Sequence, residues 1–274
     1  MTAKEALLEV KKTLERAGIP EAEAKAKVII SHALDIGYSD VYTNIGVPAG
    51  ALEQIKLMLG RCASGEPVEY ITGRAYFRYL ALEVNPYVLI PRSETELVAG
   101  KAIELIRQNS YHTALDMCTG SGCIAISLAT ETKAAVTAAD ISEEALAVAK
   151  SNAQLCGAAG IRFINSDMFG NIDAVYDIIV CNPPYVSEEE YAALNESVKR
   201  EPKLALLAGD GYDFYRRIAG ESAAFLNDGG ALVLEIGAGQ AREVTELLLT
   251  GGFGGIECIK DYAGRDRIVC AFKG

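Results

Sequence analysis

The residues with the most distinctive chemistry form a short run, Asn182-Pro183-Pro184-Tyr185, which follows an apolar stretch ending at Cys181. Two successive prolines restrict the backbone and remove two amide donors. The turn therefore presents acceptors, namely the side-chain oxygen of Asn182 and the carbonyl oxygen of Pro183, while Tyr185 adds a flat face. A planar NH2 group has two hydrogens that it can donate to these acceptors. The run is thus typical of a site that binds an amide or an aryl amine.

These acceptors indicate a type of reaction. The lone pair of an amide or aryl amine is delocalised, so this nitrogen is a poor nucleophile. Two hydrogen bonds from its hydrogens raise its electron density, and orientation and fixed dipoles then favour its attack on a methyl group. No strongly basic side chain is required, because the nitrogen becomes acidic once it is methylated. We therefore predict methyl transfer to a planar nitrogen; the alternative is a stiff turn that only ends a strand.

A second candidate site is the run Cys118-Thr119-Gly120-Ser121-Gly122, which joins a predicted strand to a predicted helix. Its two glycines allow a sharp turn and the close approach of a ligand, as in the ligand-binding loops of open α/β sheets. The next predicted strand ends at Asp140, roughly 20 residues further on, where a carboxylate can accept hydrogen bonds from ribose hydroxyls. A tight turn and a helix cap are the structural alternatives. Together, loop and acid predict an adenosine-bearing cofactor and leave NAD and S-adenosylmethionine both open.

Both candidate sites depend on strands that alternate with helices, and the sequence after Pro91 has this pattern. It predicts an α/β fold with a mostly parallel sheet and helices on both faces. The last two strands are too close together for a crossover helix, so we expect them to pair antiparallel. The predicted strands are residues 111–118, 134–140, 161–166, 176–181, 229–236, 255–260 and 267–272, and the predicted helices are residues 123–130 and 142–156.

The residues before Pro91 have two other patterns. In residues 1–69, apolar side chains recur at three- and four-residue steps, which predicts a small N-terminal helical domain. In residues 70–90, apolar and polar side chains alternate, which predicts a β-hairpin connector. Residues 91–274 then form the cofactor-binding, catalytic domain.

The composition and charge of the chain indicate which partners and which cellular compartment to expect. The formal net charge is −11, whereas a protein that binds a nucleic-acid backbone usually has a basic face. The two histidines, His32 and His112, lie near no ligand cluster, so we expect no metal. No apolar run is long enough to span a bilayer, and the start lacks the features of a secretory signal. We expect a soluble, cytoplasmic protein with no membrane contact, whose seven cysteines stay reduced.

The chain resembles the release factor glutamine methyltransferases, the HemK/PrmC family of class I S-adenosylmethionine-dependent methyltransferases. The resemblance extends over nearly the whole chain and includes both candidate sites. The Asn-Pro-Pro-Tyr turn alone is shared with adenine-N6 and guanine-N2 methyltransferases. Two further features restrict the resemblance to this family: the helical N-terminal domain and the run Pro91-Arg92-Ser93-Glu94-Thr95-Glu96. Further matching runs are Glu69–Gly73, Ser166–Phe169, Glu201–Pro202, Asp210–Gly211, Leu234–Gly237 and Gly264–Arg267.

The resemblance implies a Rossmann-like class I methyltransferase sheet with its last strand antiparallel, and it implies how the cofactor is bound. Residues 118–122 would hold the methionine part of S-adenosylmethionine, and Asp140 would bind the ribose. Met168 would lie beside the adenine, where some members have an aromatic residue. Ser93 replaces a proline that is frequent in the family, which affects neither Arg92 nor Glu94.

The resemblance also implies the substrate. Asn182 would stand between cofactor and substrate, and residues 182–185 would hold a glutamine amide, with Asn182, Pro183 and Tyr185 as the catalytic residues. The implied substrate is the glutamine of the Gly-Gly-Gln motif of peptide chain release factors, which the N-terminal domain would help to hold. The implied products are N5-methylglutamine and S-adenosylhomocysteine, and we expect a monomer.

Two alternatives remain at this point. One is a nucleic-acid methyltransferase that acts on an exocyclic amine of a flipped base; the acidic charge speaks against it, and nucleic acid is not expected as the direct substrate. The other is a non-catalytic cofactor-binding module. The sequence leaves open the roles of Arg92, Glu94, Glu201 and Phe77. Phe77 could touch the cofactor or seal an interface, and the segment from Glu201 to Leu206 could border the substrate channel or form a solvated loop.

Overall fold

The computed structural model describes all residues from 1 to 274. It comprises two compact units, one formed by Met1–Arg74 with Asn195–Arg200 and the other by Ala75–Leu194 with Glu201–Gly274. None of the helices combines the length and the apolar character that crossing a membrane requires.

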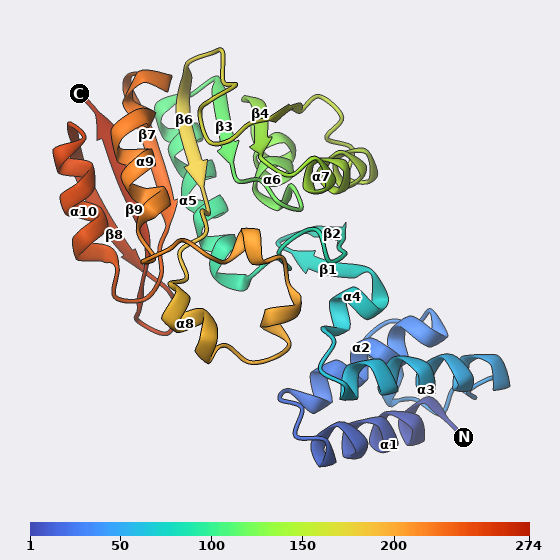
Figure 1. Ribbon diagram of the computed structural model, residues 1–274. Helices are drawn as coiled ribbons and strands as arrows, with labels where there is room; N and C mark the ends of the chain where they lie inside the picture. Colours follow the sequence, from blue (N-terminus) through green and yellow to red (C-terminus); the bar gives the residue numbers. More distant parts are fainter. The chain divides into compact units, whose positions relative to one another are not determined.

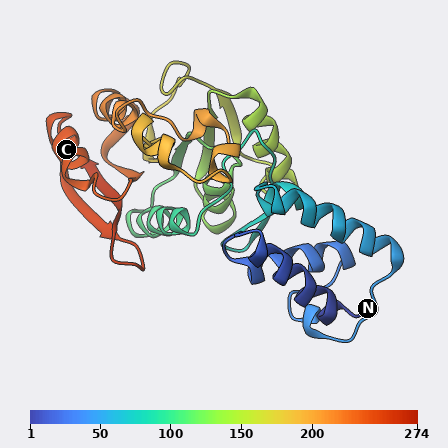
Figure 2. The same cartoon turned by 60° about the horizontal axis from the view of Figure 1, so that its bottom comes forward.

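The first unit is helical, as its sequence pattern predicts, and Figure 2 shows its helices side by side. A capping box starts the first helix: the Thr2 hydroxyl accepts from the Glu5 amide, and the Glu5 carboxylate accepts from the Thr2 amide. Leu14 and Ile29 are fully buried between the helices. The helices are α1 (Ala3–Arg16), α2 (Ala22–Leu34), α3 (Ala49–Ala63) and α4 (Val68–Thr72), with a 3₁₀ helix η1 (Asp40–Tyr42).

Not every apolar side chain of the helix α3 lies in the core of this unit. Ile55 is buried, but 67% of Leu57 is exposed. Successive residues of an α-helix are rotated by about 100°, so two positions that are two residues apart point to opposite sides.

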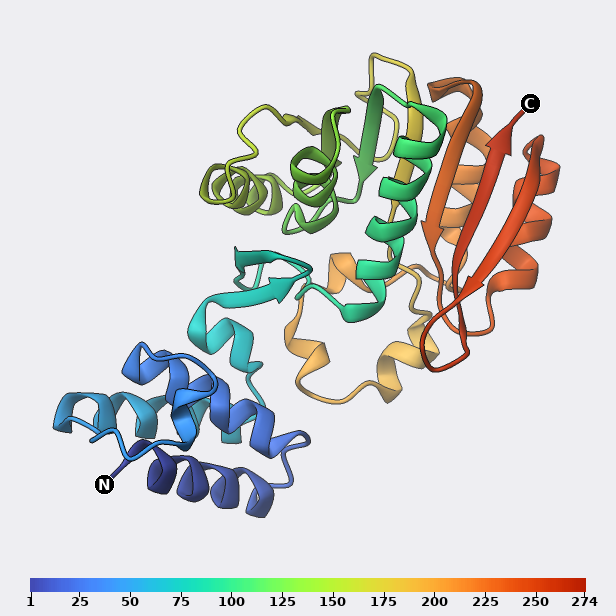
Figure 3. The same ribbon diagram turned by 180° about the vertical axis from the view of Figure 1, so that it is seen from behind.

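The second unit is built around a seven-stranded sheet with the order β5-β4-β3-β6-β7-β9-β8 (Figures 1 and 3). Its strands are β3 (Thr113–Met117), β4 (Ala135–Asp140), β5 (Arg162–Asn165), β6 (Tyr176–Cys181), β7 (Leu226–Glu235), β8 (Phe253–Lys260) and β9 (Asp266–Lys273). All neighbours from β5 to β7 pair parallel, whereas β9 runs antiparallel to both β7 and β8. The prediction of a mostly parallel sheet with an antiparallel last strand is confirmed.

Helices cover both faces of this sheet, and strands that are buried on both sides read as unbroken apolar runs. Ile178 and Val180 pack against the helices on one face, while Ile179 and Cys181 belong to the core on the other. The first face is covered by α5 (Ser93–Asn109), α6 (Cys123–Glu131) and α7 (Glu143–Leu155), and the second by α9 (Asp213–Glu221) and α10 (Ala241–Thr250). The remaining helices are α8 (Glu188–Ala193), η2 (Val198–Arg200), η3 (Lys203–Ala205) and η4 (Ser222–Phe225).

The sequence prediction was wrong for the extent of the hairpin and missed several helices. The hairpin consists only of β1 (Arg74–Phe77) and β2 (Leu80–Glu83), and not of residues 70–90. Residues 70–72 complete the helix α4, which ends at Gly73 in a left-handed conformation. The helices α5, α9 and α10 were not predicted. The buried positions of α5, from Thr95 to Ile106, recur at helical steps and were readable from the sequence.

Candidate active site

The sheet topology brings the two candidate sequence motifs together. The chain leaves β3 in one direction and β6 in the other, so a topological switch point lies between these neighbouring strands. Met117, at the end of β3, lies beside Cys181, at the end of β6. The glycine loop that follows Met117 and the Asn182 turn that follows Cys181 are therefore adjacent. Asp140, at the end of β4, lies on the other side of the glycine loop.

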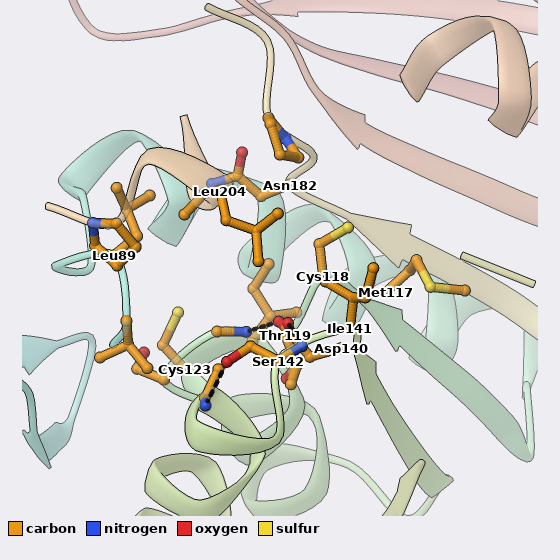
Figure 4. Close-up of a pocket in the computed structure, with 18 of the residues that line it drawn as sticks. Leu89, Met117, Cys118, Thr119, Cys123, Asp140, Ile141, Ser142, Asn182 and Leu204 are labelled. Carbon is orange, nitrogen blue, oxygen red and sulfur yellow. Dashed lines mark hydrogen bonds between the residues drawn. The ribbon is translucent and has the colours of Figure 1, made fainter. Parts of the chain in front are cut away.

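A cavity of about 300 Å³ opens at this edge of the sheet. In Figure 4, Asn182 and Leu204 lie at one end of it, and Asp140 and Ser142 at the other. Most of the predicted site residues line this cavity, namely Cys118, Thr119, Gly120, Ser121, Asp140, Met168, Asn182 and Pro184. Gly122, Pro183 and Tyr185 are not on its wall. Its size and its mixed apolar and polar lining suit a small-molecule cofactor.

The glycine loop is held by two carboxylates. Asp116 is buried and accepts from the Thr119 hydroxyl at 2.5 Å and from the Ala125 amide at 3.0 Å. Burial raises the pKa of Asp116 to about 7, although these two hydrogen bonds act against the shift. The Gly120 amide donates to Asp140 at 2.9 Å. The loop is therefore fixed from within the sheet and from the neighbouring strand.

The two glycines of the loop have different surroundings. Both have a positive φ, 53° for Gly120 and 82° for Gly122. A Cβ atom on Gly120 would meet no heavy atom within 4 Å, so this residue borders open space. A Cβ atom on Gly122 would lie 3.1 Å from the Ala149 side chain and 3.2 Å from that of Ile126. Gly122 therefore serves the close packing of α6 against α7, which its spacing in the sequence did not reveal.

Asp140 is not the N-terminal cap of α7. That cap is Ser142, whose hydroxyl accepts from the Ala145 amide at 3.0 Å. The Asp140 carboxylate accepts from the backbone amides of Ser142 and Gly120, and burial raises its pKa. Asp140 also lines the cavity.

Two wall residues have a strained backbone. Cys118 and Met168 adopt φ values of 60° and 48°, which cost non-glycine residues about 1–3 kcal/mol each. Their sulfur atoms lie 3.9 Å apart. The Ser166 hydroxyl stabilises the second conformation by donating to the Met168 carbonyl at 2.5 Å and accepting from the Asn171 amide. Strain of this kind collects at binding sites, which is consistent with the predicted role of both residues.

The Asn182 amide is oriented by a buried network. Its Nδ2 atom donates to the Thr95 hydroxyl at 3.2 Å, and this hydroxyl donates to Oε2 of Glu235 at 2.6 Å. The Tyr185 hydroxyl donates to the other oxygen, Oε1, of the same carboxylate at 3.3 Å. One carboxylate thus anchors both ends of the Asn-Pro-Pro-Tyr turn. The Oδ1 atom of Asn182 accepts no hydrogen bond within the protein and stays available as an acceptor.

Glu235 and Thr95 complete the network around Asn182, and the sequence analysis gave neither of them a role. Only 1% of Glu235 is exposed, and burial raises its pKa to about 7. A signal existed in the sequence, because Glu235 is a carboxylate at the end of the otherwise apolar run from Ala231 to Ile236. Buried carboxylates with a shifted pKa are concentrated at functional sites.

Another buried carboxylate, Glu201, supports the part of the cavity wall that contains Leu204. It pairs with Arg92 and accepts from the Ile90 amide at 3.0 Å. Pro202 and Leu204, which follow it, line the cavity. Glu201 and Leu206 of this segment are buried, whereas Lys203 and Leu204 are exposed, so only part of the segment is a solvated loop.

Phe77 is not positioned to touch a cofactor in this cavity. Its side chain is fully buried in the core formed with Leu82 and Val98, and it does not line the cavity. Glu94 lies 3.4 Å from the guanidinium of Arg265 at the surface. Phe77 is therefore part of the core of the second unit, and Glu94 forms a surface ion pair.

Comparison with known proteins places this geometry among methyltransferases. Residues 5–73 match the family model described as PrmC N-terminal domain, and residues 99–209 match the one described as Methyltransferase small domain. The chain is 39% identical to the release factor glutamine methyltransferase of Chlorobaculum tepidum, covering 91% of this chain and 90% of that protein. It is 35% identical to the protein of that name from Clostridium acetobutylicum, covering 100% and 99%.

The fold also has solved counterparts. The crystal structure of a methyltransferase from Pyrococcus furiosus matches with a TM-score of 0.53, at 20% identity, over 71% of this chain and 89% of that one. At this identity the likeness shows a common fold. The fold of the second unit is therefore that of a methyltransferase, in agreement with the names of the relatives.

Proposed function

The chain belongs to the family of release factor glutamine methyltransferases, and we propose that it transfers one methyl group to the side-chain amide of the Gly-Gly-Gln glutamine in peptide chain release factors. Family membership confirms the predictions of a class I methyltransferase, of glutamine N5 as the methylated atom and of S-adenosylmethionine as the cofactor. The observation that carries the assignment of the site is the orientation of Asn182, which lines the cavity and donates its Nδ2 hydrogen to Thr95, so that its Oδ1 atom is left as an acceptor.

S-adenosylmethionine, when bound, supplies an electrophilic methyl group on a sulfonium. In this proposal, residues 118–122 contact the methionine part of the cofactor, Asp140 contacts its ribose and Met168 contacts its adenine. Three observations support this assignment: the open space at Gly120, the carboxylate of Asp140 at the cavity wall, and the strained backbone of Met168.

The proposed task of residues 182–185 is to hold the acceptor amide. Asn182 Oδ1 and the Pro183 carbonyl accept one hydrogen each from the glutamine NH2 group, which raises the electron density on nitrogen and orients its lone pair. Tyr185 restricts the amide plane. These acceptors are fixed before the substrate arrives, because Pro183 and Pro184 are buried and the Asn182 side chain is tied to Thr95.

The remaining proposals concern partners. Residues 1–69 help to bind the release factor, and residues 91–274 carry out the catalysis. The protein acts as a monomer in the cytoplasm, and nucleic acid is not its direct substrate. The net charge of −11 supports the last point, because a phosphate backbone requires a basic surface. The role of residues 1–69 predicts a much lower KM for the intact factor than for a short Gly-Gly-Gln peptide.

The test is methyl transfer from labelled S-adenosylmethionine to a purified release factor and to its variant with alanine at the Gly-Gly-Gln glutamine. Intact-mass analysis counts the methyl groups. We expect one methyl group on the normal factor and none on the variant, and no transfer by Asn182→Ala. Label on RNA or DNA, with none on the factor, would instead support the alternative of a nucleic-acid exocyclic-amine methyltransferase.

A further inference from the structure

We propose that Glu235 and Thr95 are positioning residues that set the direction of the Asn182 amide, and that a proton on Glu235 reverses this direction and switches the site off. The inference rests on the proposed function, because it concerns the hydrogen bonds between Asn182 and the acceptor nitrogen. It assigns a role to two side chains that come from different elements, Thr95 from α5 and Glu235 from the end of β7.

The argument starts from the number of hydrogens in the network. A threonine hydroxyl has one hydrogen and two lone pairs. An ionised carboxylate has no hydrogen, so the 2.6 Å contact between Thr95 and Glu235 uses the only hydrogen of Thr95. Thr95 can then only accept from Asn182. The Asn182 amide must present its NH2 group to Thr95, and its Oδ1 atom is left for the substrate.

Protonation of Glu235 removes this restriction. A neutral carboxyl group can donate its own hydrogen to Thr95, and the Thr95 hydroxyl is then free to donate to Asn182. The Asn182 amide rotates by about 180° to accept that bond, which is a soft torsion in amide side chains. Its NH2 group then faces the substrate. Two NH2 groups cannot hydrogen-bond to each other, so the glutamine amide loses its acceptor.

The second oxygen of the carboxylate strengthens the same arrangement. Burial raises the pKa of the Tyr185 phenol, so this hydroxyl keeps its proton and donates to Oε1 of Glu235. The ionised carboxylate therefore accepts from both Thr95 and Tyr185. The two oxygens of a carboxylate accept from one donor each, whereas a glutamine at position 235 would present an NH2 group in place of one of these oxygens.

The charges around Glu235 place this switch near neutral pH. Burial is the main cause that raises its pKa to about 7, and the hydrogen bond from Thr95 opposes the shift. Arg267 on β9 also lowers the pKa of Glu235, and Glu94 on α5 raises it. With a pKa near 7, about a tenth of Glu235 is ionised at pH 6, so the rate there should be about tenfold below that at pH 8. The titratable and charged groups that act on Glu235 from the packed elements are Arg267, Glu94, Tyr185, Tyr215 and Cys123.

The first test compares two variants of Thr95. Thr95→Val has nearly the same shape but no hydroxyl, and Thr95→Ser keeps the hydroxyl. We expect Thr95→Val to lower kcat at least tenfold while the Kd for S-adenosylmethionine changes less than about threefold, and Thr95→Ser to restore kcat to within about threefold of the original chain. Equal kcat values for the valine variant and the original chain would overturn the inference.

The second test is the pH profile. We expect kcat of the original chain to rise from pH 6 to pH 8, and the profile of Glu235→Gln to lack this rise, because glutamine does not titrate. An unchanged rise in Glu235→Gln would show that another group causes it and would overturn the switch. Thermal melting and S-adenosylmethionine binding establish that each variant is folded, and the Thr95 pair decides the matter if Glu235→Gln does not fold.

A third measurement needs no activity. In protein labelled with ¹⁵N, the side-chain NH2 signals of Asn182 are identified by their absence from Asn182→Ala. They should shift with pH around 7 in the original chain and stay constant in Glu235→Gln; a constant signal in both refutes the switch. Failure to methylate a release factor would refute the proposed function and not this inference. The inference would then still be tested by these spectra, and by comparing the Thr95 variants on any other methyl acceptor.

Discussion

Gly120→Ala and Gly122→Ala should differ in their main effect, although the two residues lie in one loop. We expect Gly122→Ala mainly to lower stability and Gly120→Ala mainly to weaken cofactor binding. Both have a positive φ, so a Cβ atom costs about 1–2 kcal/mol of folding free energy at either position. At Gly122 the Cβ atom would also stand 3.1 Å from Ala149 and 3.2 Å from Ile126. Such overpacking adds about 1–3 kcal/mol. We therefore expect Gly122→Ala to lose about 2–5 kcal/mol of stability and Gly120→Ala about 1–2 kcal/mol.

Cofactor binding should follow the reverse order. Gly120 lines the cavity and its added methyl group would occupy open space there, whereas Gly122 is not on the cavity wall. We expect Gly120→Ala to raise the Kd for S-adenosylmethionine at least tenfold, which is about 1.4 kcal/mol, and Gly122→Ala to change it less than about threefold at temperatures where it is folded.

The assays are urea unfolding for stability and isothermal titration calorimetry for the cofactor, with both variants measured beside the original chain. A Gly122→Ala chain as stable as Gly120→Ala would refute the assignment of Gly122 to helix packing. An unchanged Kd in Gly120→Ala would refute the assignment of Gly120 to the cofactor wall.

Three further predictions follow from buried side chains. Burial raises the pKa of Asp116 from 3.8 to about 7, so the folded protein binds a proton at this carboxyl more tightly than the unfolded chain does. The resulting stabilisation is present below about pH 4 and is lost as pH rises through 7. Urea unfolding should therefore show a fall of about 3–4 kcal/mol over this range, and Asp116→Asn should remove this fall. Phe77→Ala should cost about 3–5 kcal/mol of stability and leave the Kd for S-adenosylmethionine unchanged in calorimetry, because Phe77 packs in the core and not at the cavity. Glu201→Ala should leave the Arg92 guanidinium and the buried Ile90 amide unpaired, which should cost about 3–5 kcal/mol of stability in urea unfolding. The same change should raise the KM for S-adenosylmethionine. An unaffected KM would show that this wall does not shape the cavity.

Much of the catalytic domain was predictable from sequence because its signals are local. The strand pattern predicted the parallel sheet and its antiparallel last strand, since apolar runs and connection lengths are properties of neighbouring residues. The glycine loop, Asp140 and the Asn182 turn were predicted for the same reason: each lies at the end of a strand or directly after it. The helix α5 was readable by the same rule and was overlooked.

Only the tertiary structure showed which side chains bind and orient these site residues. Thr95 and Glu235 are separated by 140 residues, and Arg92 and Glu201 by 109, yet each pair shares a hydrogen bond. The distinction between Gly120 and Gly122 likewise depends on Ala149 in the next helix. Periodicity indicates which side of a strand or helix is buried, but it carries no information on which elements become neighbours. The strand order brings β6 and β7 beside each other and α5 against them, and this order turned isolated polar residues into a network around Asn182.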